Sequence, residues 1–421
     1  MQRHFLHCPG AITAVLVIAA SGMAGCLAQP RMAPYPFAES PTDCRSAAAP
    51  DSASIQWVSP ADGSARDKQK LDEWCRTIGP VLVAPATSAQ SQGSLVLTVA
   101  SWNMNVGAGR LVEFVEHLRR GEFTVPDPVG DFVILLQEAY RVGAEVPRPA
   151  TSGFRIPKRL GSADPAADIR HLAALLGLHL VYAPAMRNGR TGDNEGDGDR
   201  GYGNSGDSDR GNAILSTLPL DQVMVIELPF ERQRRIAVVA TAHGATANGE
   251  PRQLRLVSTH FETRAGLTRG GPAAARRRQA RALIDALAHT TTPLIVGGDF
   301  NSSSGNDEPA VHELRAAFPA SSPTSWVTWR GPLGMSARLD HIFARVAGDP
   351  LVVRRVRDRF GSDHHPLITT MRWKEGNLCS AITRSGLESC ATSAHPTPRK
   401  FAIGNLRLRI RDEFLIPNSH L

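Results

Sequence analysis

Residues 294–301 read Leu-Ile-Val-Gly-Gly-Asp-Phe-Asn: an apolar strand at 294–298, followed at once by the carboxylate of Asp299 and the amide of Asn301. A carboxylate at the end of a buried strand costs desolvation free energy unless it has a partner or a metal ion. Taken alone, this stretch is as typical of simple turn chemistry as of a functional site. The rest of the chain decides between the two.

The same arrangement recurs elsewhere in the chain. Glu138 follows the apolar run 131–136, and His260 follows the strand predicted at 254–258. Further polar residues adjoin other predicted strands: Asn103, Asn105, Asp340, His341, Asp363, His364 and His365. Any one of them is more typical of a turn or of a satisfied histidine. The whole set is hard to explain by packing, and it predicts a polar site at strand ends.

Outward from these sites, strands and helices are mixed. Further strand patterns occur at 95–101, 178–183, 212–216, 223–227, 236–241, 327–329, 340–345 and 367–373. Helical spacing of apolar residues occurs at 67–76, 111–120, 169–176, 273–287 and 308–317. Because strands and helices do not alternate strictly, the pattern favours a mixed, largely antiparallel α/β sandwich over a doubly wound sheet.

Seven motifs resemble those of the endonuclease/exonuclease/phosphatase superfamily and occur in the same order. They are Ser101–Asn105, Leu136–Glu138, Gly211–Ser216, Ser258–Glu262, Gly297–Asn301, Leu339–Ile342 and Ser362–Pro366. The resemblance covers residues 95–373. It implies a four-layer α/β sandwich, in which two β-sheets pack face to face between outer helices and the catalytic loops gather at one edge. It also implies metal-dependent hydrolysis of phosphate esters.

The resemblance implies a site for Mg²⁺, with Mn²⁺ as a possible substitute. Glu138 is the implied ligand, and a hard carboxylate oxygen suits Mg²⁺, which keeps several waters and needs few protein ligands. Asn105 stands where the family often has a second acid, which leaves a second carboxylate ligand open. Asp363 can also ligate the metal.

The catalytic roles are implied in the same way. Asp299 would orient or deprotonate the attacking water, and Asn301 would donate a hydrogen bond to the phosphate. His364 would be protonated and would stabilise the transition state or transfer a proton, with Asp340 fixing a histidine tautomer. His260 stands where the deoxyribonuclease and sphingomyelinase branches place a second catalytic histidine.

Three residues are candidates for substrate binding. Asn103 would support the metal or the phosphate, and Asn212 would lie in the wall of the site, unless it only turns the chain at a strand start. Arg187 could contact a phosphate, although a solvated loop position suits it equally well. It opens the stretch 187–211, where Gly, Asp, Asn and Ser dominate, and which is predicted to be a flexible loop without EF-hand spacing.

The preferred hypothesis for function is a phosphodiesterase that acts on nucleic acid outside the cytoplasm. A net charge of +7 favours polyanionic partners, although the run Arg276–Arg278 is expected to be a solvated helix face. A sphingomyelinase-like phospholipid phosphodiesterase is an alternative, but no long apolar hairpin with exposed aromatic residues is evident. An inositol or sugar phosphatase also stays open. A non-catalytic binding lipoprotein predicts loss of site residues, which are present here. No protein partner is evident.

The N-terminal 28 residues are typical of an export signal. A short basic start and the apolar run 11–20 precede Met23-Ala24-Gly25-Cys26, which resembles a bacterial lipobox with Cys26 as the lipid site. The chain is therefore expected in the periplasm, anchored to a membrane as a lipoprotein, or secreted. Beyond the signal we expect a low-complexity tether and N-terminal extension (29–93), a catalytic domain (94–373) and a C-terminal extension (374–421).

Export also bears on the cysteines. Cys44, Cys75, Cys379 and Cys390 form an even set in an oxidising compartment. The local pairings 44–75 and 379–390 are the simplest of three possible connectivities. No cysteine or histidine spacing is typical of a structural zinc site.

Overall fold

The computed structural model describes residues 37–39, 55–60, 63–86, 94, 96–124, 130–146, 167–187, 208–245, 249–263, 270–320, 325–347 and 350–373. All of them belong to the larger of the two units into which the chain divides, Met1–Lys374. The predicted export signal, the candidate lipid site Cys26 and the C-terminal extension lie outside the described residues. Among the described helices, none is long and apolar enough to cross a membrane.

The first sheet has seven strands in the order β1-β2-β8-β9-β10-β11-β14. Their bounds are β1 Phe37–Glu39, β2 Gln56–Pro60, β8 Leu220–Glu227, β9 Ile236–Ala245, β10 Pro251–His260, β11 Leu294–Asp299 and β14 Asp340–Arg345. β2 pairs in parallel with β8, and β10 pairs in parallel with β11. The other pairings of this sheet are antiparallel.

The second sheet also has seven strands, in the order β15-β16-β4-β5-β7-β6-β3. Their bounds are β3 Leu82–Ala84, β4 Val96–Asn103, β5 Asp131–Val142, β6 His179–Arg187, β7 Ser208–Ser216, β15 Arg354–Arg355 and β16 Leu367–Arg372. β4 pairs in parallel with β5, and the remaining pairings are antiparallel. Both sheets are therefore mixed and mainly antiparallel, as predicted.

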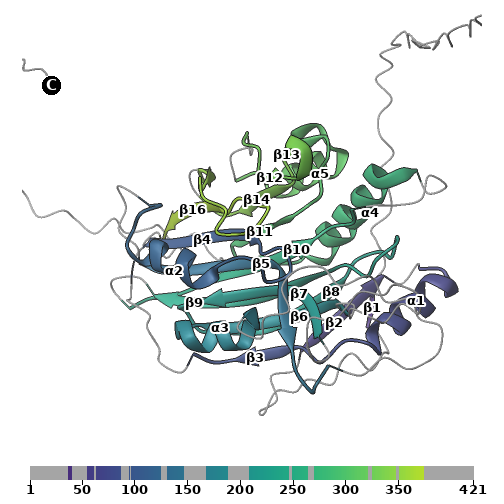
Figure 1. The fold of residues 1–421 in the computed structure, drawn as a ribbon, viewed down its shortest axis with the longest axis horizontal. Coiled ribbons are helices and arrows are strands. Elements are labelled where there is room, and N and C mark those ends of the chain that lie inside the picture. Colours follow the sequence, from purple (N-terminus) through teal and green to yellow (C-terminus); the bar gives the residue numbers. More distant parts are fainter. Residues whose placement is uncertain are drawn as a thin grey trace, which may run out of the picture. The chain divides into compact units, whose positions relative to one another are not determined.

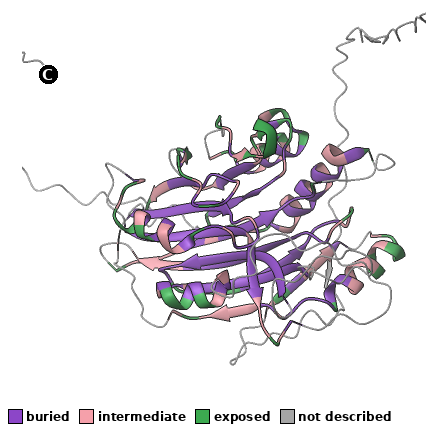
Figure 2. Cartoon of the chain, viewed as in Figure 1, coloured by how far each residue is buried: buried purple, intermediate pink, exposed green. Residues whose placement is uncertain are grey.

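The two sheets pack face to face, because side chains of both meet in one apolar core. Val99 and Leu135 of the second sheet lie in the same cluster as Val238 and Leu256 of the first. Helices α2 (Leu111–Arg119) and α3 (Ile169–Leu176) pack on the outer side of the second sheet, and α4 (Gly271–Ala286) and α5 (Pro309–Ala317) pack on the first (Figure 1). The strands are buried along most of their length, whereas the helices expose one side (Figure 2). This arrangement confirms the four-layer α/β sandwich.

The segment before residue 94 contributes to both sheets. β2 extends the first sheet, β3 extends the second, and α1 (Ala65–Cys75) lies between them in sequence. Trp57 of β2 and Val81 next to β3 are buried in the core that the two sheets share. Much of the range predicted to be a tether and extension is therefore built into the sandwich.

A buried ion pair also holds this segment. Arg141 of β5 pairs with Asp209 of β7, and both side chains are fully buried. Asp209 accepts a hydrogen bond of 2.8 Å from the backbone N–H of Gly79, and Arg141 donates one of 2.7 Å to the carbonyl of Pro80. The turn after α1 is thus tied to the centre of the second sheet. Cys75 at the end of α1 is disulfide-bonded, and every other cysteine of the chain lies outside the described residues.

Three local predictions were wrong. β5 does not end at Leu136 but continues to Val142 through a bulge between Leu136 and Ala139. β7 begins at Ser208, inside the stretch predicted to be a loop, whose residues 188–207 lie outside the described residues. Arg276 is not solvated: its side chain is buried and pairs with Glu308 at 2.7 Å, because α4 packs this face against the segment before α5.

Candidate active site

Strand pairing in the first sheet brings three of the predicted residues side by side. β10 and β11 run in parallel with His260 opposite Asp299, and β14 runs antiparallel to β11 with Asp340 opposite Asp299. His260, Asp299 and Asp340 thus occupy one row across three neighbouring strands. The alignment explains why polar residues at the ends of strands far apart in sequence belong to one site.

Three site residues have a left-handed backbone. The φ angles are 50° at Asn105, 51° at Glu138 and 50° at Asn301. This region is costly for residues other than glycine and persists where the surrounding structure imposes it. At Glu138 the cause is the bulge in β5, which re-aims this side chain where regular pairing with β7 is interrupted.

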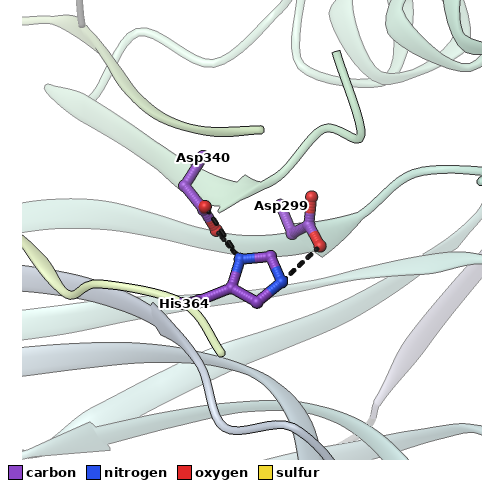
Figure 3. A group of neighbouring side chains, drawn as sticks. All are labelled: Asp299, Asp340 and His364. Carbon is purple, nitrogen blue, oxygen red and sulfur yellow. Dashed lines mark hydrogen bonds and ion pairs between the residues drawn. The ribbon is translucent and has the colours of Figure 1, made fainter. Parts of the chain in front are cut away.

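His364 lies between two aspartates (Figure 3). Its Nδ1 is 2.9 Å from Oδ2 of Asp340, and its Nε2 is 3.7 Å from Oδ2 of Asp299. All three side chains are almost fully buried. Burial alone would lower the pKa of His364, but the charges of Asp340 and Asp299 outweigh it and raise the pKa to about 10. His364 is therefore a charged imidazolium at neutral pH.

Oδ2 of Asp299 is the atom on which the other polar groups converge. It accepts a hydrogen bond of 3.0 Å from Nδ2 of Asn103 and lies 3.4 Å from Nε2 of His260. Its second oxygen accepts from the backbone N–H of Asn301 at 2.9 Å. Burial raises the pKa of Asp299 to about 7, against the charge of His364, which lowers it. A carboxylate with such a pKa can take up a proton near neutral pH.

His260 is held in the opposite state from His364. Burial, together with the charges of Arg235, His364 and Arg210, lowers its pKa well below the ordinary value. Its Nδ1 lies 3.9 Å from Oε1 of Glu138. The site therefore combines one neutral and one charged imidazole on either side of Asp299, the division of labour that acid–base chemistry requires.

The candidate metal ligands lie at the two ends of this set of contacts. Glu138 contacts His260, and Oδ1 of Asp363 lies 3.9 Å from Nε2 of His364. The side chains of Glu138 and Asp363 keep 20% and 37% of their surface exposed, so solvent and substrate can reach them. Hard carboxylate oxygens open to water fit Mg²⁺.

A second grouping also offers metal ligands. Asp299, Asp340 and His364 present ligand atoms within 4.8 Å of one another. A protonated imidazole has no lone pair for a metal, however, and the raised pKa of His364 keeps it protonated. In this protonation state the trio can hold a proton and a charge, while Glu138 offers a partly exposed carboxylate to a metal.

Buried polar bonds join the two sheets behind the site. Nε2 of Gln137 donates to Oγ of Ser258 at 3.0 Å, and that hydroxyl donates to the carbonyl of Leu136 at 2.8 Å. Within the second sheet, Nε1 of Trp102 in β4 donates to the carbonyl of His364, just before β16, at 3.1 Å. The two bonds of Ser258 therefore tie the half of the site on the first sheet to the half on the second.

The remaining predicted residues are placed differently. Asn105 donates its backbone N–H to Oδ1 of Asn103 at 2.9 Å and so orients that side chain. Asn212 donates to the carbonyl of Ile236 at 2.8 Å and lines a pocket with Glu138 and His260. Arg187 is fully buried, and its guanidinium lies 3.5 Å from the carbonyl of Thr77.

Two arginines of the site were missed from the sequence. Arg210 and Arg235 are buried and line the same pocket as Glu138 and His260. A signal exists for Arg210, because it precedes Asn212 by two positions and therefore shares its face of the strand. Arg235 directly precedes β9 within a run of charged residues, where nothing local marks it as buried.

The model of the Endonuclease/Exonuclease/phosphatase family matches residues 100–364. The solved catalytic domain of human Nocturnin shares 17% identity, with 69% of this chain and 96% of that chain covered and a TM-score of 0.42. An endonuclease/exonuclease/phosphatase from Beutenbergia cavernae shares 18% identity over 66% and 71% of the two chains, with a TM-score of 0.44.

Sphingomyelinase C from Streptomyces griseocarneus shares 17% identity over 65% of this chain and 99% of its own, with a TM-score of 0.39. No curated protein matches the chain. The family match spans more than half of the chain and includes every strand-end residue of the site from Asn103 to His364. On this match, the chain belongs to the Endonuclease/Exonuclease/phosphatase family.

Proposed function

We propose that the chain is a metal-dependent phosphodiesterase whose substrate is nucleic acid. The observation that carries the proposal is the placement of Asp299 between a charged and a neutral histidine, His364 and His260. Such a pair can take a proton from water and stabilise negative charge within one site. Phosphodiester hydrolysis requires both.

Each residue has a role in this proposal. Asp299 orients the attacking water and accepts its proton, while Asn103 and Asn301 hold Asp299 and the phosphate in line. His364, kept charged by Asp340, stabilises the negative charge that develops on the phosphate oxygens. Glu138, together with Asn105 or Asp363, would hold Mg²⁺ or Mn²⁺, which supplies charge neutralisation at the phosphate.

Nucleic acid is favoured by the net charge of +7 and by the buried arginines beside the site. One observation favours a second candidate, a phospholipid substrate. β12 (Trp329–Arg330) and β13 (Ser336–Ala337) form a hairpin whose turn exposes Leu333 completely and Met335 by half. The hairpin adjoins the site, because Nε1 of Trp329 donates to Oδ2 of Asp363 at 2.8 Å.

Export is part of the proposal and rests on the N-terminal 28 residues. The apolar run and the Met-Ala-Gly-Cys stretch support secretion through a membrane, with Cys26 as the lipid anchor. We expect the full chain to fractionate with membranes and Cys26→Ser to abolish lipid labelling. Recovery of the full chain in the cytoplasmic fraction would contradict export.

Hydrolysis by residues 29–421 tests the activity. Plasmid DNA, RNA, sphingomyelin and inositol phosphates are incubated with Mg²⁺ or Mn²⁺, and with EDTA as a control. We expect metal-dependent cleavage of nucleic acid that His364→Ala abolishes and His312→Ala, on the exposed side of α5, does not. Turnover of sphingomyelin alone would mean that the protein is a phospholipid phosphodiesterase rather than a nuclease. Turnover of inositol phosphates alone would mean that it is a phosphatase. No turnover of any substrate would favour a non-catalytic binding protein.

A further inference from the structure

A pocket next to the catalytic residues has a positively charged wall. Glu138 and His260 line one part of it, and Arg210, Arg235 and Asn212 line another. The pocket is open on one side, and its empty volume of about 240 Å³ includes the open solvent there. Since His260 lies 3.4 Å from Asp299, the pocket adjoins the proposed catalytic residues.

The two guanidinium groups of this wall are buried and incompletely bonded. Arg210 is 6% exposed and Arg235 is 4% exposed. Among the described residues, Nη1 of Arg210 and Nε of Arg235 have no hydrogen-bond partner. Arg210 donates its Nη2 to the thioether of Met186 at 3.2 Å, and a thioether is a weak acceptor. Buried donors without acceptors are costly, so both point to an anion that completes them.

The surrounding charges lead to the same conclusion. The two arginines repel each other, and the carboxylates that act on Arg235 are Glu262, Glu138 and Asp299. Glu262 already accepts from the backbone N–H groups of Arg232 and Gln233. Glu138 and Asp299 belong to the catalytic site. A bound anion would therefore balance charges that these carboxylates leave uncompensated.

We propose that Arg210 and Arg235 form a subsite for a second phosphate group of the substrate, adjacent to the phosphoester that is cleaved. The planar, forked guanidinium matches the oxygens of a phosphate, and two of them can share one group. The second phosphate could belong to a nucleotide or to a phosphorylated headgroup. The statement that this phosphate belongs to the substrate rests on the proposed phosphodiesterase function. The binding of phosphate by Arg210 and Arg235 does not depend on that function.

Binding of inorganic phosphate tests the subsite without turnover. Titration calorimetry in EDTA compares the wild type with Arg210→Gln, and with Arg66→Gln, which removes the same charge from the exposed face of α1. We expect Arg210→Gln to weaken phosphate binding about tenfold or more, the range of a charged hydrogen bond, and Arg66→Gln to bind as the wild type does. Arg210→Lys, which keeps the charge, should bind phosphate with an affinity between those of the wild type and Arg210→Gln. It takes the place of Arg210→Gln in the comparison if that variant does not fold.

A pair of substrates tests the preference. The p-nitrophenyl ester of thymidine 5′-phosphate is compared with the same ester carrying a 3′-phosphate, and inositol bisphosphates form the headgroup arm. We expect the wild type to have a higher kcat/KM for the ester with the second phosphate than for the ester without it. In Arg210→Gln the ratio of these two kcat/KM values should fall about tenfold or more. Equal ratios, or equal phosphate affinities, in the wild type and the variant would overturn the proposal. An inactive protein that binds phosphate through Arg210 would instead refute the proposed function and leave the subsite standing.

Discussion

At the scale of the residue, Asp340 controls the charge of the histidine that lies beside Asp299. Its carboxylate lies 2.9 Å from Nδ1 of His364 and helps to raise the pKa of that imidazole to about 10. His364 is therefore charged below that pH and loses its charge as the pH rises through it. Asp299, with a pKa of about 7, acquires its charge as the pH rises through that value. Activity should be highest between the two.

Removal of the Asp340 charge gives the first prediction. In Asp340→Asn the pKa of His364 falls, so the alkaline limb of the kcat/KM profile should move to lower pH. The acidic limb, which reports Asp299, should move less. The profile of kcat/KM against pH for both proteins measures this shift. An alkaline limb at the same pH in the variant would mean that Asp340 does not control the ionisation of His364.

A second prediction concerns the metal. If Glu138 holds Mg²⁺, then Mg²⁺ binds the folded protein and should raise its melting temperature, by mass action. Glu138→Gln keeps the backbone and side-chain size but loses the charge, so we expect that stabilisation to vanish together with activity. Differential scanning fluorimetry with Mg²⁺ and with EDTA gives a readout that does not depend on turnover. Equal stabilisation of both proteins would place the metal elsewhere.

The sequence predicted those site residues whose position is marked by a strand. Asp299 and His260 could be found because an apolar run ends directly before each of them. Arg235 could not, because its burial follows from the packing of β9 against the second sheet, which no local spacing reports. Likewise, nothing in the sequence indicates that Arg187, at the end of β6, is fully buried.

At the scale of the element, the arginines of α4 link it to α5 and to the segment before it. Arg276 is buried against Glu308, whereas Arg277 pairs with Glu313 at 2.6 Å with about a third of its side chain exposed. Arg276→Ala leaves a buried carboxylate unpaired, which costs about 3–5 kcal/mol. Arg277→Ala should cost about 0–1 kcal/mol.

Urea denaturation of the two variants measures this difference, with the neighbouring arginine as the matched control. We also expect neither substitution to change DNA affinity much, since both side chains are engaged within the protein. Similar free energies of unfolding for the two variants would show that burial does not distinguish the pairs.

The elements themselves followed largely from apolar periodicity. α3 was predicted with both of its bounds from helical spacing, and in the structure Asp168 caps its first turn and Gly177, with φ of 65°, ends it. The extension of β5 beyond Leu136 was missed, since its polar residues Gln137 and Glu138 resemble a strand end. They lie instead at a bulge, where a strand continues although its hydrogen-bond ladder is interrupted.

At the scale of the whole molecule, the fold begins well before the first recognisable motif. Removal of residues 1–93 would take β1 and β2 from the edge of the first sheet and β3 from the edge of the second. It would also remove Trp57 and Val81 from the shared core and the bond of Gly79 to Asp209. A protein of residues 94–421 should therefore be much less stable than residues 29–421, or fail to fold. Comparison of their melting temperatures by circular dichroism measures the effect. Equal melting temperatures would make the segment dispensable.

The fold class was predictable because seven ordered motifs and the mixture of strands and helices agree with each other. The strands β2 and β3 were not, because they are short and lie in a segment rich in Pro, Ala and Ser. Their pairing with β8 and β6 depends on long-range register rather than on local sequence. Composition describes such a segment poorly when its pairing partners lie about a hundred residues or more away along the chain.

The division of the site between two sheets has a consequence for how the enzyme should fail. Asn103 comes from one sheet and Asp299 from the other, and a single hydrogen bond of 3.0 Å joins them. A small slip of one sheet over the other would break this bond while each ladder stayed intact. During storage or gentle warming, catalytic power should therefore decay first, in molecules whose backbone still looks native.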